Sequence, residues 1–291
     1  MRSAIAIKTI LVAASGGTAT RGTIELACQL AQRFRAHIEG YHVLLDPQAA
    51  LASMGEDAGL GLTGTLIESI EAVARVRAEE TRSLFAKVLV RREIAMGEGP
   101  HAVEHRASGS WRQESGYAPV LVANRARFFD LVVLGRSERA IGQPYTDTIE
   151  QVLTSSGRPV LLAPADAPAS VGNTVAIAWN GSPESVRAPS ASLPFIMSAA
   201  AVWMITAGLN DYEPVSAIEY LAWHDIKVQH RKLPDRAARH VGSRLLDAAQ
   251  SCGADLLVMG GYGHAFWREM VFGGATLEIV KSASMPLLLM H

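Results

Sequence analysis

A glycine-rich segment near the end of the chain has the residue types and spacing that suit phosphate binding. Gly260–Gly263, read Gly-Gly-Tyr-Gly, closes a strongly apolar run, and nine residues then lead to Gly273–Gly274. Glycine permits positive φ and, because it lacks a Cβ, lets backbone N–H groups approach an anion closely. A helix expected from Ala275 adds its N-terminal amides and partial positive charge. The segment predicts a triphosphate held mainly by backbone; the alternative is that these glycines only shape a tight loop.

Other reactive residues form no recognised catalytic or metal-binding pattern. The nine histidines contain no H-E-x-x-H spacing, and His101 and His105 lie in a glycine- and proline-flanked stretch. No G-x-S-x-G elbow, P-loop or dinucleotide fingerprint is present. Cys28 and Cys252 lie in helical patterns outside any C-x-x-C. We therefore expect no metal site, no disulfide framework and no defined catalysis, with slow ATP hydrolysis as the weakest alternative.

The composition describes a folded α/β protein with balanced charge. Lys and Arg total 27 against 28 Asp and Glu, which favours neither nucleic acid nor an anionic membrane as a partner. No apolar stretch of about 18 residues lacks charges and breakers, so we expect no membrane span. Lys8 interrupts the apolar start, which we interpret as mature protein rather than a signal peptide. A reducing cytoplasm is the expected location.

The chain contains two halves of the same design. Four segments recur in the same order, each an aliphatic strand or a helix start with matching polar residues. They are Thr9–Gly17 with Thr174–Ser182, Asp130–Gly135 with Asp255–Gly260, Thr148–Val152 with Thr276–Val280, and Pro159–Leu162 with Pro286–Leu289. Such self-similarity predicts a repeated supersecondary unit. We expect one domain over residues 1–167 and a second over residues 168–291, joined near Pro164–Pro168.

Each half alternates apolar strands with amphipathic helices, which predicts βαβ units and a parallel sheet. The expected strands are Ile10–Ala14, His37–Leu44, Val103–Arg106, Asp130–Gly135 and Val160–Ala163, then Val175–Trp179, Val202–Thr206, Lys227–Arg231, Asp255–Gly260 and Pro286–Met290. Helices are expected over Ser182–Ser198, Glu213–Trp223, Asp235–Ser251 and Ala275–Ser282. The first half adds a glycine-rich loop, Asp46–Gly64, and a long helix, Leu66–Val90.

These motifs resemble the universal stress proteins. The family motif is Gly, two residues, Gly, nine residues, then Gly followed by Ser or Thr, and Gly260, Gly263 and Gly273 fit it. The resemblance extends over both halves, as in a tandem member. It implies two flavodoxin-like (Rossmann-like) domains, each with a five-stranded parallel sheet, related by a pseudo-twofold axis. It also implies binding of ATP or a related adenine nucleotide, with or without Mg²⁺, and a role in stress adaptation rather than catalysis.

The resemblance also assigns candidate nucleotide contacts in the second half. They are Asn180, Ile205, Thr206, Met259, Gly260, Gly263, Gly273, Gly274 and Thr276. Two of them depart from the family pattern. Gly274 stands where Ser or Thr would donate a hydroxyl, with Thr276 as a substitute. Asn180 stands where ATP binders commonly carry Asp, so it keeps an acceptor and adds donors.

The first half departs further from the motif. Glu138 stands opposite Gly263, and Tyr145 and Thr146 stand opposite Gly273–Gly274. A carboxylate repels an anion and bulky side chains block the backbone, so we expect a degenerate first-half site. Ser15 replaces the acidic position there.

The last strand of each half is expected to pair with its counterpart. This pairing covers two apolar edges and gives an internal pseudo-dimer, while a homodimer stays open. The leading hypothesis is an adenine-nucleotide-binding stress protein that acts on an unknown protein partner. The alternative is an interaction scaffold of the same fold that binds no nucleotide.

Overall fold

The computed structural model describes residues 7–46, 64–97, 106–136, 145–207, 214–234, 240–261 and 275–291. The chain divides into two compact units. The N-terminal unit holds Ile7–Arg158 with Ala165–Ala167, and the C-terminal unit holds Pro159–Pro164 with Pro168–His291. No helix in the described ranges combines the length and the apolar character needed to cross a membrane.

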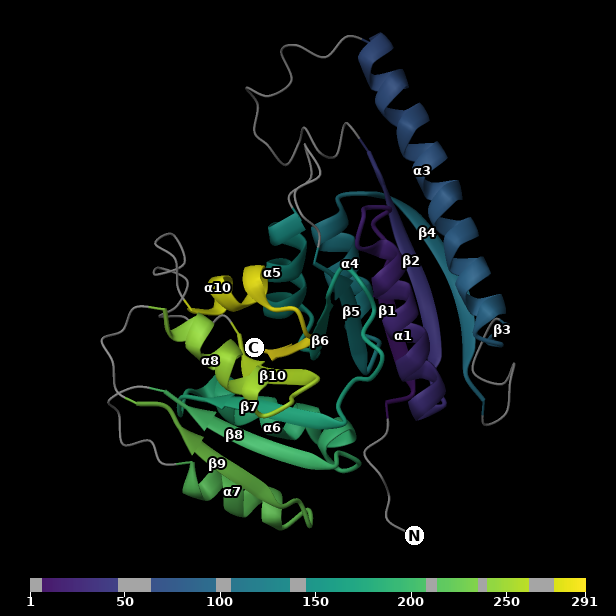
Figure 1. Ribbon diagram of the computed structural model, residues 1–291. Helices are drawn as coiled ribbons and strands as arrows, with labels where there is room; N and C mark the ends of the chain where they lie inside the picture. The colour runs from purple at the N-terminus through teal and green to yellow at the C-terminus, as the bar shows by residue number, and fades with distance from the viewer. Residues whose placement is uncertain are drawn as a thin grey trace. The chain divides into compact units, whose positions relative to one another are not determined.

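The N-terminal unit is a parallel sheet with helices on both faces (Figure 1). Its strand order is β3-β4-β2-β1-β5, and every neighbouring pair is parallel. The helices α1 and α3 pack together, as do α4 and α5. Its elements in chain order are β1 (Thr9–Ala13), α1 (Thr20–Phe34), β2 (His37–Leu45), α3 (Gly64–Arg91), β3 (Ala95–Met96), β4 (Ser108–Gly116), α4 (Ala118–Ala126), β5 (Leu131–Gly135) and α5 (Tyr145–Ser155).

The C-terminal unit has the same plan, with strand order β6-β11-β10-β7-β8-β9. All neighbouring pairs from β11 to β9 are parallel, whereas β6 joins β11 antiparallel through Leu162 opposite Leu287. This is the pairing expected of the two matching end strands. The elements are β6 (Val160–Ala163), β7 (Thr174–Trp179), α6 (Pro183–Ile196), β8 (Ala201–Thr206), α7 (Val215–Ala222), β9 (Val228–Lys232), α8 (Val241–Ser251), β10 (Leu256–Gly260), α10 (Ala275–Ser282) and β11 (Leu287–Met290).

The sequence repeat reflects a shared way of starting the central strand. In the N-terminal unit Asp130 Oδ2 accepts hydrogen bonds from the amides of Lys8 (2.8 Å) and Thr9 (3.0 Å). In the C-terminal unit Asp255 Oδ1 accepts from the amide of Thr174 (2.9 Å). Each aspartate therefore sits just before one buried strand and fixes the start of its neighbour, which explains why Asp and Thr recur together.

The buried strands are confirmed, and one polar strand was not predicted. The central strands β1, β5, β7 and β10 are almost wholly buried, which accounts for their continuous aliphatic sequences. Residues 103–105 of the predicted strand Val103–Arg106 lie outside the described residues, and the strand that follows runs over Ser108–Gly116. Its sequence is polar because part of it is exposed, so hydrophobic patterning does not detect it.

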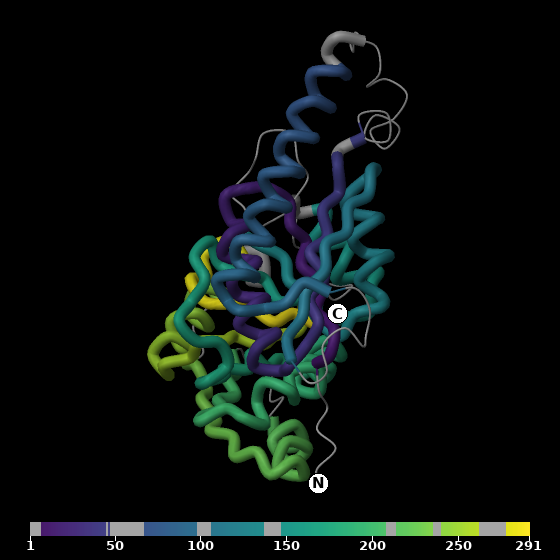
Figure 2. The backbone as a smooth tube through the Cα atoms, turned by 90° about the vertical axis from the view of Figure 1, so that its right-hand side faces the viewer, coloured from purple at the N-terminus to yellow at the C-terminus, as the bar shows by residue number. Residues whose placement is uncertain are grey.

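The long helix predicted over Leu66–Val90 is confirmed as α3. It packs against β2 and runs beside that strand in both views (Figure 1, Figure 2). Buried Phe85, Val88 and Leu89 hold its last turns on the sheet. The glycine-rich loop predicted before it lies outside the described residues.

Candidate functional site

The carboxyl edge of the C-terminal sheet is the place where this fold offers a ligand site. β7 is the first strand of that parallel sheet, and β8 and β10 pair with it on opposite sides. The connections from β7 and β10 therefore leave in opposite directions, and in parallel sheets ligands generally bind beyond the strand ends at such a point. Asn180, Thr206 and Gly260 lie at this edge, at the ends of β7, β8 and β10.

Gly260 is fixed by close packing between strand and helix. A Cβ on this residue would lie 2.6 Å from the carbonyl carbon of Glu184 and 2.6 Å from the amide nitrogen of Ser185. Both atoms are backbone in the first turn of α6, so they cannot move aside as a side chain can. Glycine is therefore required here by the approach of α6 to β10, independently of any ligand.

The amide of Gly261 is already used by the protein. It donates to the carbonyl of Met290 (2.9 Å) and so continues the ladder between β10 and β11. This amide is not available to an anion. Gly263, Gly273 and Gly274 lie outside the described residues, and Thr276 is placed in the first turn of α10.

Asn180 forms a local turn at the end of β7. Its side-chain Oδ1 accepts a hydrogen bond from the amide of Ser182 (3.0 Å), while Gly181 takes φ 76°. Ser182 in turn caps α6, because its hydroxyl accepts from the amide of Ser185 (3.2 Å). The Asn180 acceptor is thus engaged, and its exposed side chain offers two N–H donors at this edge.

The other side chains at this edge are largely buried. Ile205 is fully buried, and Met259 is 6% exposed. Thr206 is half-buried, and its hydroxyl lies 3.0 Å from Nε2 of His230 on the neighbouring strand β9. Ile205 and Met259 therefore line the apolar base of this edge, and the Thr206 hydroxyl is oriented by a histidine that the sequence patterns did not single out.

A carboxylate also lies in the first turn of α10. Glu278 accepts a hydrogen bond from the Ser243 hydroxyl, and its Oε1 is 3.6 Å from Nδ1 of His240. The Ser243 hydrogen bond and the nearby His240 hold the pKa of Glu278 below its usual value. The start of the helix that follows the glycine loop is therefore tied to α8 through a negative charge. Sequence reasoning missed this cluster, because Ser243 and Glu278 are 35 residues apart.

The matching edge of the N-terminal unit is built differently. Gly135 lies against Ala19 and Thr23 of α1, as Gly260 lies against α6. Gly16 has φ 79°, and a Cβ there would lie 2.5 Å from Cγ of Arg77 and 2.9 Å from the Thr81 hydroxyl. The helix α3 thus covers the loop after β1. Glu138 lies outside the described residues, and Tyr145 begins α5.

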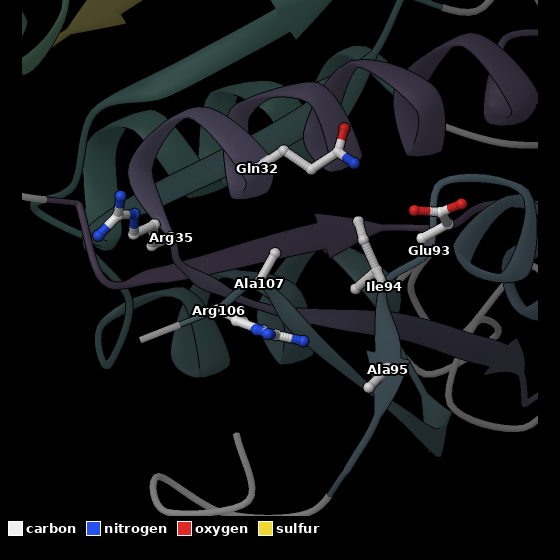
Figure 3. A pocket seen from close by; sticks show the side chains of 7 residues that line it. All are labelled: Gln32, Arg35, Glu93, Ile94, Ala95, Arg106 and Ala107. Atoms are coloured by element: carbon white, nitrogen blue, oxygen red, sulfur yellow. The ribbon is translucent and has the colours of Figure 1, made fainter. Parts of the chain in front are cut away.

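A cavity of about 300 Å³ lies at the opposite, amino edge of the N-terminal sheet. Its lining comes from the end of α1, from the segments that precede β2 and β4, and from Glu93–Ala95 at the start of β3 (Figure 3). The lining residues are Gln32, Arg35, Glu93, Ile94, Ala95, Arg106 and Ala107. This cavity is unrelated to the glycine loop, which leaves from the carboxyl edge of the other unit.

Solved structures share this fold, although sequence comparison finds no relative. No family model matches the chain, and no curated protein matches it in sequence. A universal stress protein from Archaeoglobus fulgidus DSM 4304 matches with TM-score 0.68 at 14% identity, covering 97% of both chains. A putative universal stress protein from Pseudomonas aeruginosa UCBPP-PA14 matches with TM-score 0.51 at 14% identity, covering 98% of this chain and 93% of that one.

A functionally unknown protein from Pseudomonas aeruginosa PAO1 also matches, with TM-score 0.50 at 15% identity, covering 98% of this chain and 92% of that one. These similarities extend over nearly the whole length of each chain rather than over one half. The chain therefore has the fold of the universal stress proteins.

Proposed function

We propose that the C-terminal unit binds an adenine nucleotide and that the protein acts as a universal stress protein. The observation that carries the proposal is the strand order at β7 and β10, whose connections leave on opposite sides. There Asn180 and Gly260 end adjacent strands, and the segment with Gly263 and Gly273–Gly274 leads from β10 into α10. The proposal assigns a ligand-dependent conformation or partner choice and no catalytic step.

Each part of the nucleotide has a candidate partner at this edge. The Asn180 side-chain NH₂ group can donate to adenine or ribose. The Thr206 hydroxyl, which His230 orients, ends the neighbouring strand β8 and offers a second polar group. The phosphates would rest on backbone amides of Gly263 and Gly273–Gly274 and on the start of α10. ATP and its relatives share this chemistry, with or without Mg²⁺.

A scaffold without nucleotide is the second candidate function. Two observations favour it: the Gly261 amide is bonded to Met290, and the Asn180 acceptor is bonded to Ser182. The Gly274 position also lacks the hydroxyl of the family motif. If the remaining glycines serve only to turn the chain, the fold would present protein-binding surfaces alone.

Isothermal titration with ATP, AMP and a cyclic nucleotide separates the two candidates. Gly263→Glu adds a carboxylate and a side chain at the centre of the expected phosphate site. Ala200→Glu is the matched control, because it adds the same group at an exposed position before β8, on the opposite edge of the sheet. Binding that Gly263→Glu abolishes and Ala200→Glu preserves supports the nucleotide site. Absence of binding by the unaltered chain supports the scaffold.

A further inference from the structure

The first helix of the N-terminal unit starts without a cap. Ala19 holds the N-cap position of α1, no side chain bonds to the first turn, and that turn contains no acidic residue. The amides of Thr20 and Thr23 donate to Gly17 and Ala19 (both 3.0 Å), whereas Arg21 and Gly22 have no such partner in the described ranges. Two amides at the positive end of a 15-residue helix are therefore unpaired.

A buried hydroxyl lies at the same helix end. Thr20 is 3% exposed, and its Oγ1 has no hydrogen-bond partner. The Thr23 hydroxyl, one turn later, donates to the carbonyl of Ala19 (2.8 Å), whereas the Thr20 hydroxyl makes no such bond. An unpaired buried hydroxyl destabilises a fold, so its presence points to a partner that arrives from outside the chain.

Two arginines lie on segments that contact this helix start. Arg77 of α3 packs its aliphatic stem on Gly16, and no carboxylate pairs with it among the described residues. Arg136 directly follows Gly135, the residue that lies against Ala19 and Thr23. Burial lowers the pKa of Arg136 to about 10, and this side chain already has an interaction within the chain. The Glu25 carboxylate of α1 pairs with Arg91 (2.6 Å).

The matching helix of the C-terminal unit lacks all of these features. Ser182 caps α6, Pro183 occupies the first helical position, and Glu184 places a carboxylate in the first turn. The Ser182 hydroxyl already bonds an amide that an anion would otherwise meet, and the Glu184 carboxylate repels an anion. The open start of α1 is thus a difference between two otherwise matching elements.

We propose that the N-terminal unit binds the phosphate group of a small phosphorylated molecule at the start of α1, through the amides of Arg21 and Gly22, the Thr20 hydroxyl and the Arg77 guanidinium. This site goes beyond the nucleotide site proposed for the C-terminal unit and uses none of its residues. It depends on side chains and a helix end rather than on a glycine loop.

Amide NMR of the full chain, titrated with inorganic phosphate and separately with AMP, tests the site. The Arg21 and Gly22 amides of the unaltered chain should shift saturably. Arg77→Gln keeps the stem on Gly16 but removes the charge, so it should weaken binding about tenfold. Arg75→Gln, on an exposed arginine of the same helix, should leave binding unchanged. A shift with AMP but not with phosphate would assign the site to a phosphate ester.

Thr20→Val gives a second, independent test. Removing an unpaired buried hydroxyl at constant shape should raise Tm while weakening phosphate binding, whereas a purely structural threonine would lose stability. Gly263→Glu should leave the Arg21 and Gly22 shifts intact, which keeps this site distinguishable from the nucleotide site. An unaltered chain without saturable shifts, or equal affinity in Arg77→Gln, would overturn the proposal.

Discussion

The two units surround the carboxyl edge of the sheet with different groups. In the C-terminal unit a capped helix and a carboxylate close the start of α6, and the connection after β10 carries the glycines. In the N-terminal unit the start of α1 is open, and α3 covers the loop after β1 with Arg77 and Thr81. A repeated fold can therefore keep its strands and its strand-starting aspartates while it changes which groups face a ligand.

The difference shows that fold and site are specified by separate residues. Asp130 and Asp255 do the same structural task in both units, and so do Gly135 and Gly260. The residues that distinguish the units lie in the first turn after the central strand and in the inserted helix. The framework that the two units share consequently does not show whether either sheet edge binds a ligand.

Alanine at the two strand-ending glycines should produce the largest effect. Gly260→Ala drives a methyl into the backbone of Glu184 and Ser185, so we expect a loss of about 3 kcal/mol in the free energy of unfolding. Gly135→Ala meets mainly the rotatable Thr23 hydroxyl and the Ala19 methyl, so its loss should be smaller. Urea unfolding of both variants measures the difference.

Gly261→Ala is the control for these two substitutions. Its new methyl would meet Leu289 at 3.6 Å, an ordinary contact, so stability should change little. Equal losses from Gly260→Ala and Gly261→Ala would show that the close approach of α6 does not set the requirement for glycine.

Removal of the strand-starting carboxylates should have an intermediate and symmetric effect. Asp130→Ala and Asp255→Ala each leave strand amides without an acceptor, and we expect each to destabilise the chain by about 2 kcal/mol. Thermal unfolding monitored by circular dichroism compares the two. A large loss from one and none from the other would contradict the shared structural role.

The matched carboxylates Glu278 and Glu150 should respond oppositely to pH. The Ser243 hydrogen bond lowers the pKa of Glu278, so its stabilisation is present above the unfolded pKa and is lost as pH falls below about 4. Burial and Asp147 raise the pKa of Glu150, so the folded state disfavours its charged form at neutral pH. Each effect should be about 0.5 kcal/mol.

Urea unfolding of the glutamine variants measures whether each carboxylate raises or lowers the free energy of unfolding. At neutral pH Glu278→Gln should destabilise the chain and Glu150→Gln should stabilise it slightly. Both differences from the unaltered chain should shrink below about pH 4, where the glutamates are protonated. Variants that shift stability in the same direction would contradict the assigned environments.

The sequence predicts the framework well because its signals are local. Aliphatic runs and the recurrence of Asp and Thr locate the buried strands, and glycine locates their ends. The polar strand over Ser108–Gly116 is not predicted, because its partly exposed residues carry no hydrophobic pattern. A hydrophobic pattern requires a buried face, so partly exposed strands of this kind cannot be recognised from their own residues alone.

The site is less predictable because its contacts join distant residues. The approach of Glu184 to Gly260 and the contact of Thr206 with His230 depend on how strands and helices pack. The proximity of Arg77 to Gly16, just before α1, likewise depends on the packing of α3. Spacing in one segment does not contain this information.

Amide hydrogen exchange with and without saturating ATP tests the central claim most directly, because it locates the nucleotide along the chain. The account predicts slower exchange in peptides that cover residues 180–182 and 262–276. Unchanged exchange throughout residues 262–276 at saturating ATP would contradict it.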